Sequence, residues 1–246
     1  NMRFRIATFF LCSFLIPGAA LAQNTLQDPG SFLGYELGTR FSRHSAVVDY
    51  FQHVSSQSDR VLTFSYGQTN EGRPLVVAFV SAPENMARLE QIRRDNLRLT
   101  QLEAGTPEGA PVSIVWLSYN VHGNESNSTE ASMATLYALA NPDNPEASAW
   151  LKNTVVVLDP AINPDGRDRY ANWYNMMVGT TMNVSRDAIE HDEPWPGGRT
   201  NHYYFDLNRD WSWQTQVETQ QRMELYKKWM PQVHVDFHEQ GVNNPY

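Results

Sequence analysis

The sequence has almost no cysteine, since Cys12 is the single one among 246 residues. One thiol can form neither a disulfide framework within the chain nor a metal site made of several thiolates. Any metal must therefore be bound by histidine and carboxylate side chains, which are ligands suited to catalytic zinc.

Basic residues are also few. The sequence has 19 Lys and Arg against 27 Asp and Glu, which gives a formal net charge of −8 at pH 7, and it shows no cluster of lysines and arginines. Binding to the phosphates of DNA or RNA depends on such a cluster. The charge pattern therefore argues against nucleic acid as a partner.

A hydrophobic run of about 18 residues, long enough to span a membrane, is missing as well. The apolar run at residues 9–16 is short, and it lies between a basic start at Arg3 and Arg5 and the small residues of Ala20-Leu21-Ala22. This order is typical of a secretory signal peptide, and a buried N-terminal helix is the weaker alternative. We predict a signal peptide at residues 1–22, a periplasmic or secreted protein, and no membrane span after signal cleavage.

The predicted mature chain, residues 23–246, would contain no thiol nucleophile because cleavage removes Cys12. Cleavage would also remove two of the basic residues and none of the acidic ones, so the formal charge would become −10. Hydrophobic residues make up 41% of the sequence, enough for a sizeable core. We find no internal repeat and no low-complexity linker, and therefore expect one domain.

Hydrophobic periodicity predicts strands that alternate with helices. Strands are expected at 61–66, 75–81, 112–119, 154–158 and 233–237, and helices at 45–55, 84–102, 129–140 and 218–229. The first two strands flank a polar turn and are expected to form a hairpin. Residues 167–205 are expected to be irregular, and Asn127 to cap the helix that follows it, with Glu130 three residues on. The alternation predicts an α/β fold whose sheet is partly parallel and covered on both faces.

The strongest local pattern is His122-Gly123-Asn124-Glu125, which follows the strand expected at 112–119. In open α/β sheets, ligands bind beyond the carboxyl ends of the strands, where this loop lies. A histidine and a carboxylate three residues apart can bind one metal ion together, but the pattern often arises by chance. His122 and Glu125 are therefore candidate ligands that need support from elsewhere.

That support comes from Val233-His234-Val235-Asp236-Phe237-His238, whose alternation predicts a strand. His234 and His238 share a face of it but lie about 13 Å apart at about 3.3 Å per residue, so only one of them can join His122. His238 ends the strand and is the candidate ligand, whereas His234 is expected to be a hydrogen-bonded histidine of the sheet. Two histidines and one carboxylate, with water in the fourth position, make an open catalytic zinc site.

A third pattern is Asp206-Leu207-Asn208-Arg209-Asp210-Trp211. Asn208 and Arg209 can offer a carboxylate an amide and a planar guanidinium fork. A surface salt bridge beside a turn amide is the alternative and the usual role of such a pair.

Five motifs in this order resemble those of one enzyme family. They are Gly67-Gln68-Thr69-Asn70-Glu71-Gly72-Arg73-Pro74, His122-Gly123-Asn124-Glu125, Asn163-Pro164-Asp165-Gly166, Asp206-Leu207-Asn208-Arg209 and Asp236-Phe237-His238. Over roughly residues 35–246, the chain resembles the zinc metallocarboxypeptidases related to carboxypeptidase A. The resemblance implies a mixed, largely parallel twisted sheet of about eight strands with helices on both faces. It also implies zinc as the cofactor.

The resemblance further implies a role for each matched residue. His122, Glu125 and His238 would be the zinc ligands, and Asp206 would hydrogen-bond the first zinc histidine and fix its tautomer. Asn208 and Arg209 would bind the C-terminal carboxylate of a peptide substrate.

The arginine that stabilises the oxyanion in this family has no unambiguous match here. Arg199 lies nine residues before Asn208, as in the cytosolic carboxypeptidase branch, so we prefer it as the catalytic arginine. Arg167, Arg169 and Arg186 are the other candidates.

Two more features depart from the family. Asn124 replaces an arginine of some members, and this form of the motif also occurs in the aspartoacylase and succinylglutamate desuccinylase branch. The general-base glutamate of the family lies several dozen residues beyond the last zinc histidine, whereas this sequence ends at Tyr246, eight residues after His238. We therefore expect the domain to lack its C-terminal part and this chain alone to be inactive. Glu239 is no substitute, since on a strand it would point to the opposite face from His238.

The sequence thus predicts a zinc metallocarboxypeptidase that removes C-terminal residues from peptides with a free terminal carboxylate. One alternative is a zinc deacylase of N-acyl amino acids, against which the export signal and the Asn163-Pro164-Asp165-Gly166 motif count. Others are a carboxypeptidase of cell-wall peptides and a non-catalytic peptide-binding module that has lost its base. A glutamate on a later strand would favour an enzyme, and its absence a module.

Overall fold

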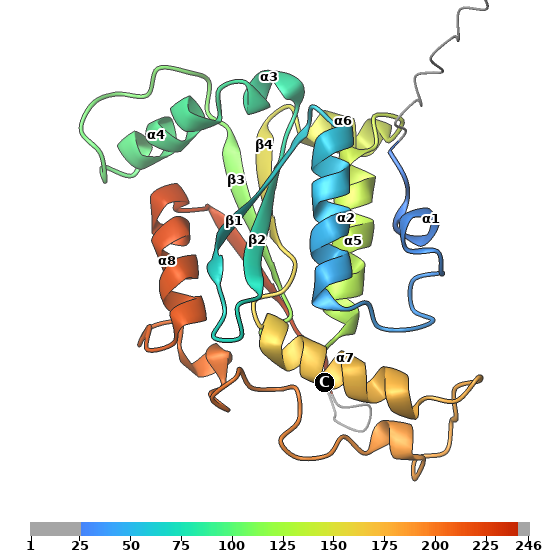
Figure 1. Ribbon diagram of the computed structural model, residues 1–246. Coiled ribbons are helices and arrows are strands. Elements are labelled where there is room, and N and C mark those ends of the chain that lie inside the picture. The colour runs from blue at the N-terminus through green and yellow to red at the C-terminus, as the bar shows by residue number, and fades with distance from the viewer. Residues whose placement is uncertain (1–25, 241–246) are drawn as a thin grey trace, which may run out of the picture.

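The computed structural model of the protein describes residues 26–240, so the predicted signal peptide lies outside the described residues. Within them, five strands form one sheet in the order β1-β2-β4-β3-β5 (Figure 1). The strands are β1 (Val61–Gln68), β2 (Pro74–Val80), β3 (Ser113–Tyr119), β4 (Thr154–Asp159) and β5 (Val233–Phe237). The predicted hairpin is confirmed, because β1 pairs with β2 in antiparallel fashion.

The remaining pairings determine where the loops meet. β2 is antiparallel to β4, while β3 is parallel to both β4 and β5. The carboxyl ends of the three parallel strands therefore lie along the same edge of the sheet. The segments that follow Tyr119, Asp159 and Phe237 all leave from this edge.

Helices cover both faces of the sheet and this edge (Figure 1). They are α1 (Pro29–Leu33), α2 (His44–Gln57), α3 (Pro83–Met86), α4 (Leu89–Leu99), α5 (Asn127–Ala140), α6 (Pro145–Trp150), α7 (Pro164–Met177) and α8 (Val217–Trp229), with the 3-10 helices η1 (Ile189–His191) and η2 (Leu207–Arg209). α2 and α5 lie on one face, α4 and α8 lie on the other, and α7 lies across the carboxyl ends of the parallel strands (Figure 1). By the test of helix length and apolarity, every helix in residues 26–240 falls short of what a membrane span requires.

Two hydrophobic cores explain why the central strands are apolar along their whole length. In β4, Val156 and Leu158 pack in the core shared with α2 and α5, whereas Val155 and Val157 pack in the core shared with Trp229 of α8. Successive side chains of a strand point to opposite faces, so a strand covered on both sides needs an unbroken apolar run.

The predicted mixed α/β class is confirmed, with five strands in residues 26–240 where the resemblance implied about eight in the whole domain. The helix expected at 84–102 is divided, since α3 ends at Met86 and α4 begins at Leu89. The prediction that residues 167–205 are irregular is wrong at its start. Asn163 caps α7 by accepting a hydrogen bond from the Gly166 N–H, and Pro164 occupies the first turn, where its missing N–H costs nothing.

The predicted cap of α5 is also wrong. Asn127 is the first residue of the helix, and its backbone N–H and side-chain amide donate to the two carboxylate oxygens of Glu239, at 2.7 and 3.0 Å. Glu130 does not take part in capping either. Its carboxylate is buried and accepts hydrogen bonds from the Ser42 N–H and from Arg167.

Candidate metal centre

Asn120 shapes the loop that carries the His122-Gly123-Asn124-Glu125 motif. Its backbone has a φ of 61°, a left-handed conformation that asparagine tolerates better than most residues. Its buried side-chain amide donates to the carbonyl oxygens of His122 and Glu125, at 2.8 and 3.0 Å. The side chain of Asn120 therefore fixes the turn on which both candidate ligands sit.

Gly123 brings this loop against two others. A Cβ atom added at Gly123 would overlap the backbone of Gly166 at the start of α7 and the carbonyl of Gly198. A Cβ at Gly166 would also overlap the Gly198 carbonyl. These glycines are required by close packing of backbone on backbone, which places the 198–209 segment beside His122.

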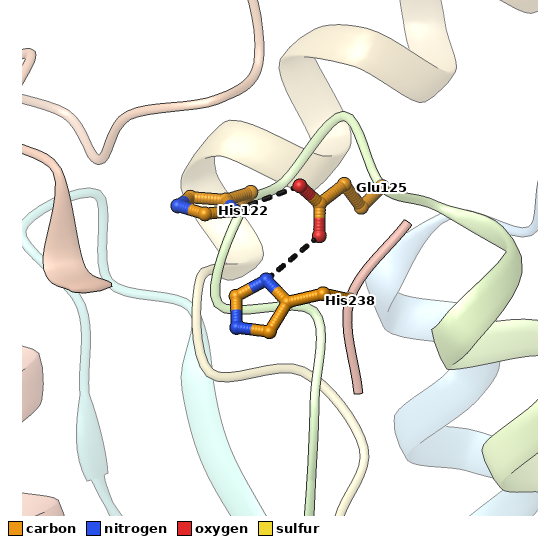
Figure 2. Close-up of side chains that lie close together, drawn as sticks. All are labelled: His122, Glu125 and His238. Carbon is orange, nitrogen blue, oxygen red and sulfur yellow. Dashed lines mark hydrogen bonds and ion pairs between the residues drawn. The ribbon is translucent and has the colours of Figure 1, made fainter. Parts of the chain in front are cut away.

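His122, Glu125 and His238 come together at the carboxyl edge of the sheet (Figure 2). One ligand atom from each lies within 4.8 Å of the others. Nδ1 of His122 is 2.8 Å from one oxygen of Glu125, and Nδ1 of His238 is 3.1 Å from the other. The structure thus brings together the three residues that the sequence proposed as ligands, from the loops after β3 and β5.

Each histidine has a second carboxylate on its other nitrogen. Nε2 of His122 is 3.1 Å from Asp206, and Nε2 of His238 is 3.0 Å from Asp236. Such carboxylates hold metal-binding histidines in one orientation and make them better ligands. Asp206 was expected in this place, whereas Asp236 was not given this role, although the strand pattern put it on the same face as His238.

Glu125 is held in place by more than the histidines. The backbone N–H of Glu239 donates to it at 3.0 Å. Burial raises the pKa of the Glu125 carboxyl, but the hydrogen bond with His122, the Glu239 N–H and the nearby histidine charges outweigh burial and lower it overall. Glu125 is therefore held in its ionised form, which is the form that binds a cation.

Of the four arginines considered, Arg199 is the one placed beside this cluster. It bonds Asp206 through Nε and Nη2, at 3.2 and 3.0 Å, and its Nη1 is 4.0 Å from Glu125. Arg167 is buried against Glu130, and Arg169 donates to backbone carbonyls of the 197–201 segment. Arg186 is exposed in the segment between α7 and η1.

Asn208 and Arg209 lie in η2, directly after Asp206. The Asn208 N–H donates to Asp206 at 2.9 Å, which ties η2 to the carboxylate behind His122. Arg209 is exposed, and its guanidinium donates only to the Asn208 carbonyl, at 3.2 Å, with no ion pair to any carboxylate of residues 26–240. The surface salt bridge considered as its alternative role is not formed by these residues.

His234 takes the role expected of it. Its Nε2 is 2.9 Å from the Ser118 hydroxyl on the neighbouring strand, and it is not part of the metal cluster formed by the described residues.

The donor set fits a catalytic zinc ion. Two imidazole nitrogens and one carboxylate oxygen converge, and each imidazole has a carboxylate on its other side. The side chain of His238 is 34% exposed, so the cluster is open to solvent on that side. Closed structural zinc sites use four protein ligands, whereas three ligands and an open side are typical of catalytic ones.

Asp206→Asn is expected to weaken zinc binding by about 10- to 100-fold without emptying the site at saturating metal. The amide keeps the shape of Asp206 but lacks the charge that polarises His122 and pairs with Arg199. Competition between the protein and a chelator of known affinity measures the change. An unchanged affinity would mean that Asp206 serves only the turn at Asn208.

Comparisons with known proteins agree with this geometry. A family model described as zinc carboxypeptidase matches residues 47–233, a range that contains His122 and Glu125 and ends just before His238. No curated protein matches the chain.

Solved structures show a similar fold. A metallo-carboxypeptidase from Burkholderia cenocepacia has a TM-score of 0.54 and 18% identity, over 80% of this chain and 40% of that one. A carboxypeptidase A from Helicoverpa armigera has a TM-score of 0.53 and 13% identity, over 87% of this chain and 51% of that one. The chain thus spans about half the length of these proteins or less.

Proposed function

We propose, because this chain belongs to the zinc carboxypeptidase family, that its metal centre serves to hydrolyse the C-terminal residue from peptides. The observation that carries the proposal is the convergence of His122, Glu125 and His238 at the carboxyl edge of the sheet. Zinc held there would supply Lewis-acid activation of water and of the scissile carbonyl.

The protein's own residues would orient the substrate around that centre. Arg199 lies beside Glu125 with its side chain 47% exposed, so its guanidinium can reach the oxygen on which negative charge develops. Asn208 and Arg209 would bind the terminal carboxylate, and their position in the helix that follows Asp206 ties that contact to the metal ligand His122.

Glu239 is held at the start of α5 and is not our candidate proton acceptor. Both of its carboxylate oxygens accept hydrogen bonds from Asn127 at the start of α5, and its backbone N–H donates a hydrogen bond to Glu125. As the resemblance to the family implies, we propose that the general base is a glutamate outside residues 26–240. We also propose export to the periplasm or secretion, on the strength of the N-terminal sequence pattern alone.

The full-length protein is expected to release the C-terminal amino acid from a peptide with a free carboxylate. Incubation with EDTA should abolish the release, and added zinc should restore it, because zinc held by His122, Glu125 and His238 would supply the activation of water. Quantifying the freed amino acid measures the activity. Activity that survives removal of zinc, or cleavage of N-acyl amino acids in place of peptides, would contradict the proposal.

A further inference from the structure

A row of polar side chains crosses the α8 face of the sheet just behind the metal centre. Ser118 of β3 pairs with Asp159 of β4 on one side and with Asp236 of β5 on the other. The row shares this face with Trp116 and Val157, which belong to the core packed against α8. Ser118 and Asp159 have no exposed surface. Two carboxylates thus lie in one row, and only Asp236 touches a candidate metal ligand.

Arg222 of α8 is a buried cation without a visible partner. It has no exposed surface, and its three guanidinium nitrogens are buried with no hydrogen-bond partner among the described residues. The guanidinium stacks on Trp211, with Cζ 4.1 Å from the ring centroid, and the ring of Trp211 lies edge-on to His234 of β5 at 5.2 Å. A buried cation is costly unless it is paired and hydrogen-bonded.

The carboxylates of the row lack a cation of their own. Asp159 forms no ion pair with a lysine or arginine of residues 26–240, and Asp236 pairs only with His238. Burial raises the pKa of Asp159 to about 7, and the charge of Arg222 and the hydroxyl of Tyr66 act in the opposite direction. Through its stacking on Trp211, which lies beside His234, Arg222 is placed on the same side of the sheet as this row.

Asp236 has an oxygen available for Arg222. Its Oδ2 is 3.0 Å from Nε2 of His238, while its Oδ1 is buried with no partner among the described residues. We propose that Arg222 is a positioning residue for the metal centre, which donates through an ordered water to Oδ1 of Asp236 and thereby holds Asp236 against His238. A buried water usually joins polar groups that would otherwise be unsatisfied, as these are.

Through Trp211, Arg222 also packs toward the segment that carries Asp206. Trp211 packs against the small core of Val121, Ile162 and Leu207, and Leu207 directly follows Asp206. Stacking of a guanidinium on tryptophan favours one position of the ring. A single buried arginine thus reaches the segments that carry Asp236 behind His238 and Asp206 behind His122. This inference rests on the metal centre proposed above.

Arg222→Met in the full-length protein is expected to weaken zinc binding by about 10- to 100-fold, the usual effect of losing support behind a ligand. Without the cation, Asp236 is left near Asp159, and its side chain, which is already 25% exposed, would turn toward solvent and release His238. The protein loaded with Co²⁺ should then show the visible absorption spectrum of an Asp236→Asn variant, because both changes free the same imidazole. Arg222→Lys keeps the cation and should recover most of the affinity.

A double-mutant cycle distinguishes positioning from a general loss of stability. If Arg222 acts through Asp236, combining Arg222→Met with Asp236→Asn should add little further loss. The double variant should bind zinc at most about threefold more weakly than whichever single variant binds it more weakly. Leu225→Ala is the matched control, since Leu225 lies one turn further along α8 in the apolar core. It should lower the melting temperature and leave zinc affinity and the Co²⁺ spectrum unchanged. Where Arg222→Met does not fold, Arg222→Gln replaces it with the same expected loss.

Unchanged zinc affinity and spectrum in the Arg222 variants would overturn this inference, as would an equal loss in Leu225→Ala. Full additivity in the cycle would also overturn it. Its failure can be told apart from failure of the proposed function. If alanine variants of His122 and His238 lose zinc while the Arg222 variants keep it, only the positioning role is wrong. If wild-type protein takes up no zinc, the metal centre itself is wrong.

Discussion

Purified protein in which His122, Glu125 or His238 is replaced by alanine is expected to retain no stoichiometric zinc. Each residue supplies one of the three ligand atoms that converge among residues 26–240, and two ligands leave the ion mostly to water. The loss should exceed the about 100-fold cost of removing a supporting carboxylate. Metal content after dialysis, measured by atomic absorption, gives the result directly.

Two variants serve as controls for this experiment. His234→Ala should keep its zinc, because His234 is bonded to Ser118 and is not part of the cluster. Glu125→Gln keeps the shape of the side chain and can still accept from the Glu239 N–H, yet should lose zinc, because the charge is what the ion requires. Full retention of zinc in any one alanine variant would remove that residue from the ligand set.

The ligand candidates could be found from the sequence because each lies at the end of a readable strand. His122 and Glu125 are three residues apart after an apolar run, and His238 ends a strand of alternating apolar residues. The rule that ligands bind at the carboxyl ends of parallel strands was then enough to place them together. What the spacing could not show was that β5 pairs with β3 and not with another strand.

The supports behind the ligands were harder to predict, because they depend on contacts between distant segments. Glu239 caps α5 from a position 112 residues away, a contact that no local pattern encodes. Asp236 is different, since the alternation of β5 placed it on the same face as His238 and could have indicated its role. The burial of Arg222 could not be predicted, because one arginine in a helix normally lies in solvent.

The error at α7 has a local cause. Asn163-Pro164-Asp165-Gly166 contains residues typical of turns, which favours an irregular segment after it. The same residues also begin a helix, with Asn as the cap and Pro in the first turn, and α7 follows them. Deciding between the two requires the apolar spacing of the next turns. That spacing is weak here, because some of the buried residues at this end of α7, such as Asp165 and Arg167, are polar.

The second large effect is expected from Arg209→Met in the full-length protein, assayed on peptides. If Arg209 binds the terminal carboxylate of the substrate, the variant should cleave peptides with a free C-terminus about 100-fold more slowly, since a charge-assisted bidentate contact is lost. The structure supports this reading, because the guanidinium is exposed and donates only to the Asn208 carbonyl among the described residues. The measurement is kcat/KM on a matched pair of peptides, one a free acid and the other its amide.

The pair of peptides also decides between binding of substrate and a role in stability. Amidation removes the same contact as the substitution, so Arg209→Met should treat acid and amide nearly alike, whereas wild type should prefer the acid strongly. Arg94→Met is the matched control: it removes the same charge from an exposed arginine of α4, which pairs with Glu103, and should keep the preference. If Arg209 were only a surface residue, its loss would change stability by at most about 1 kcal/mol. A preference for the free acid that survives in Arg209→Met would show that another group binds the carboxylate.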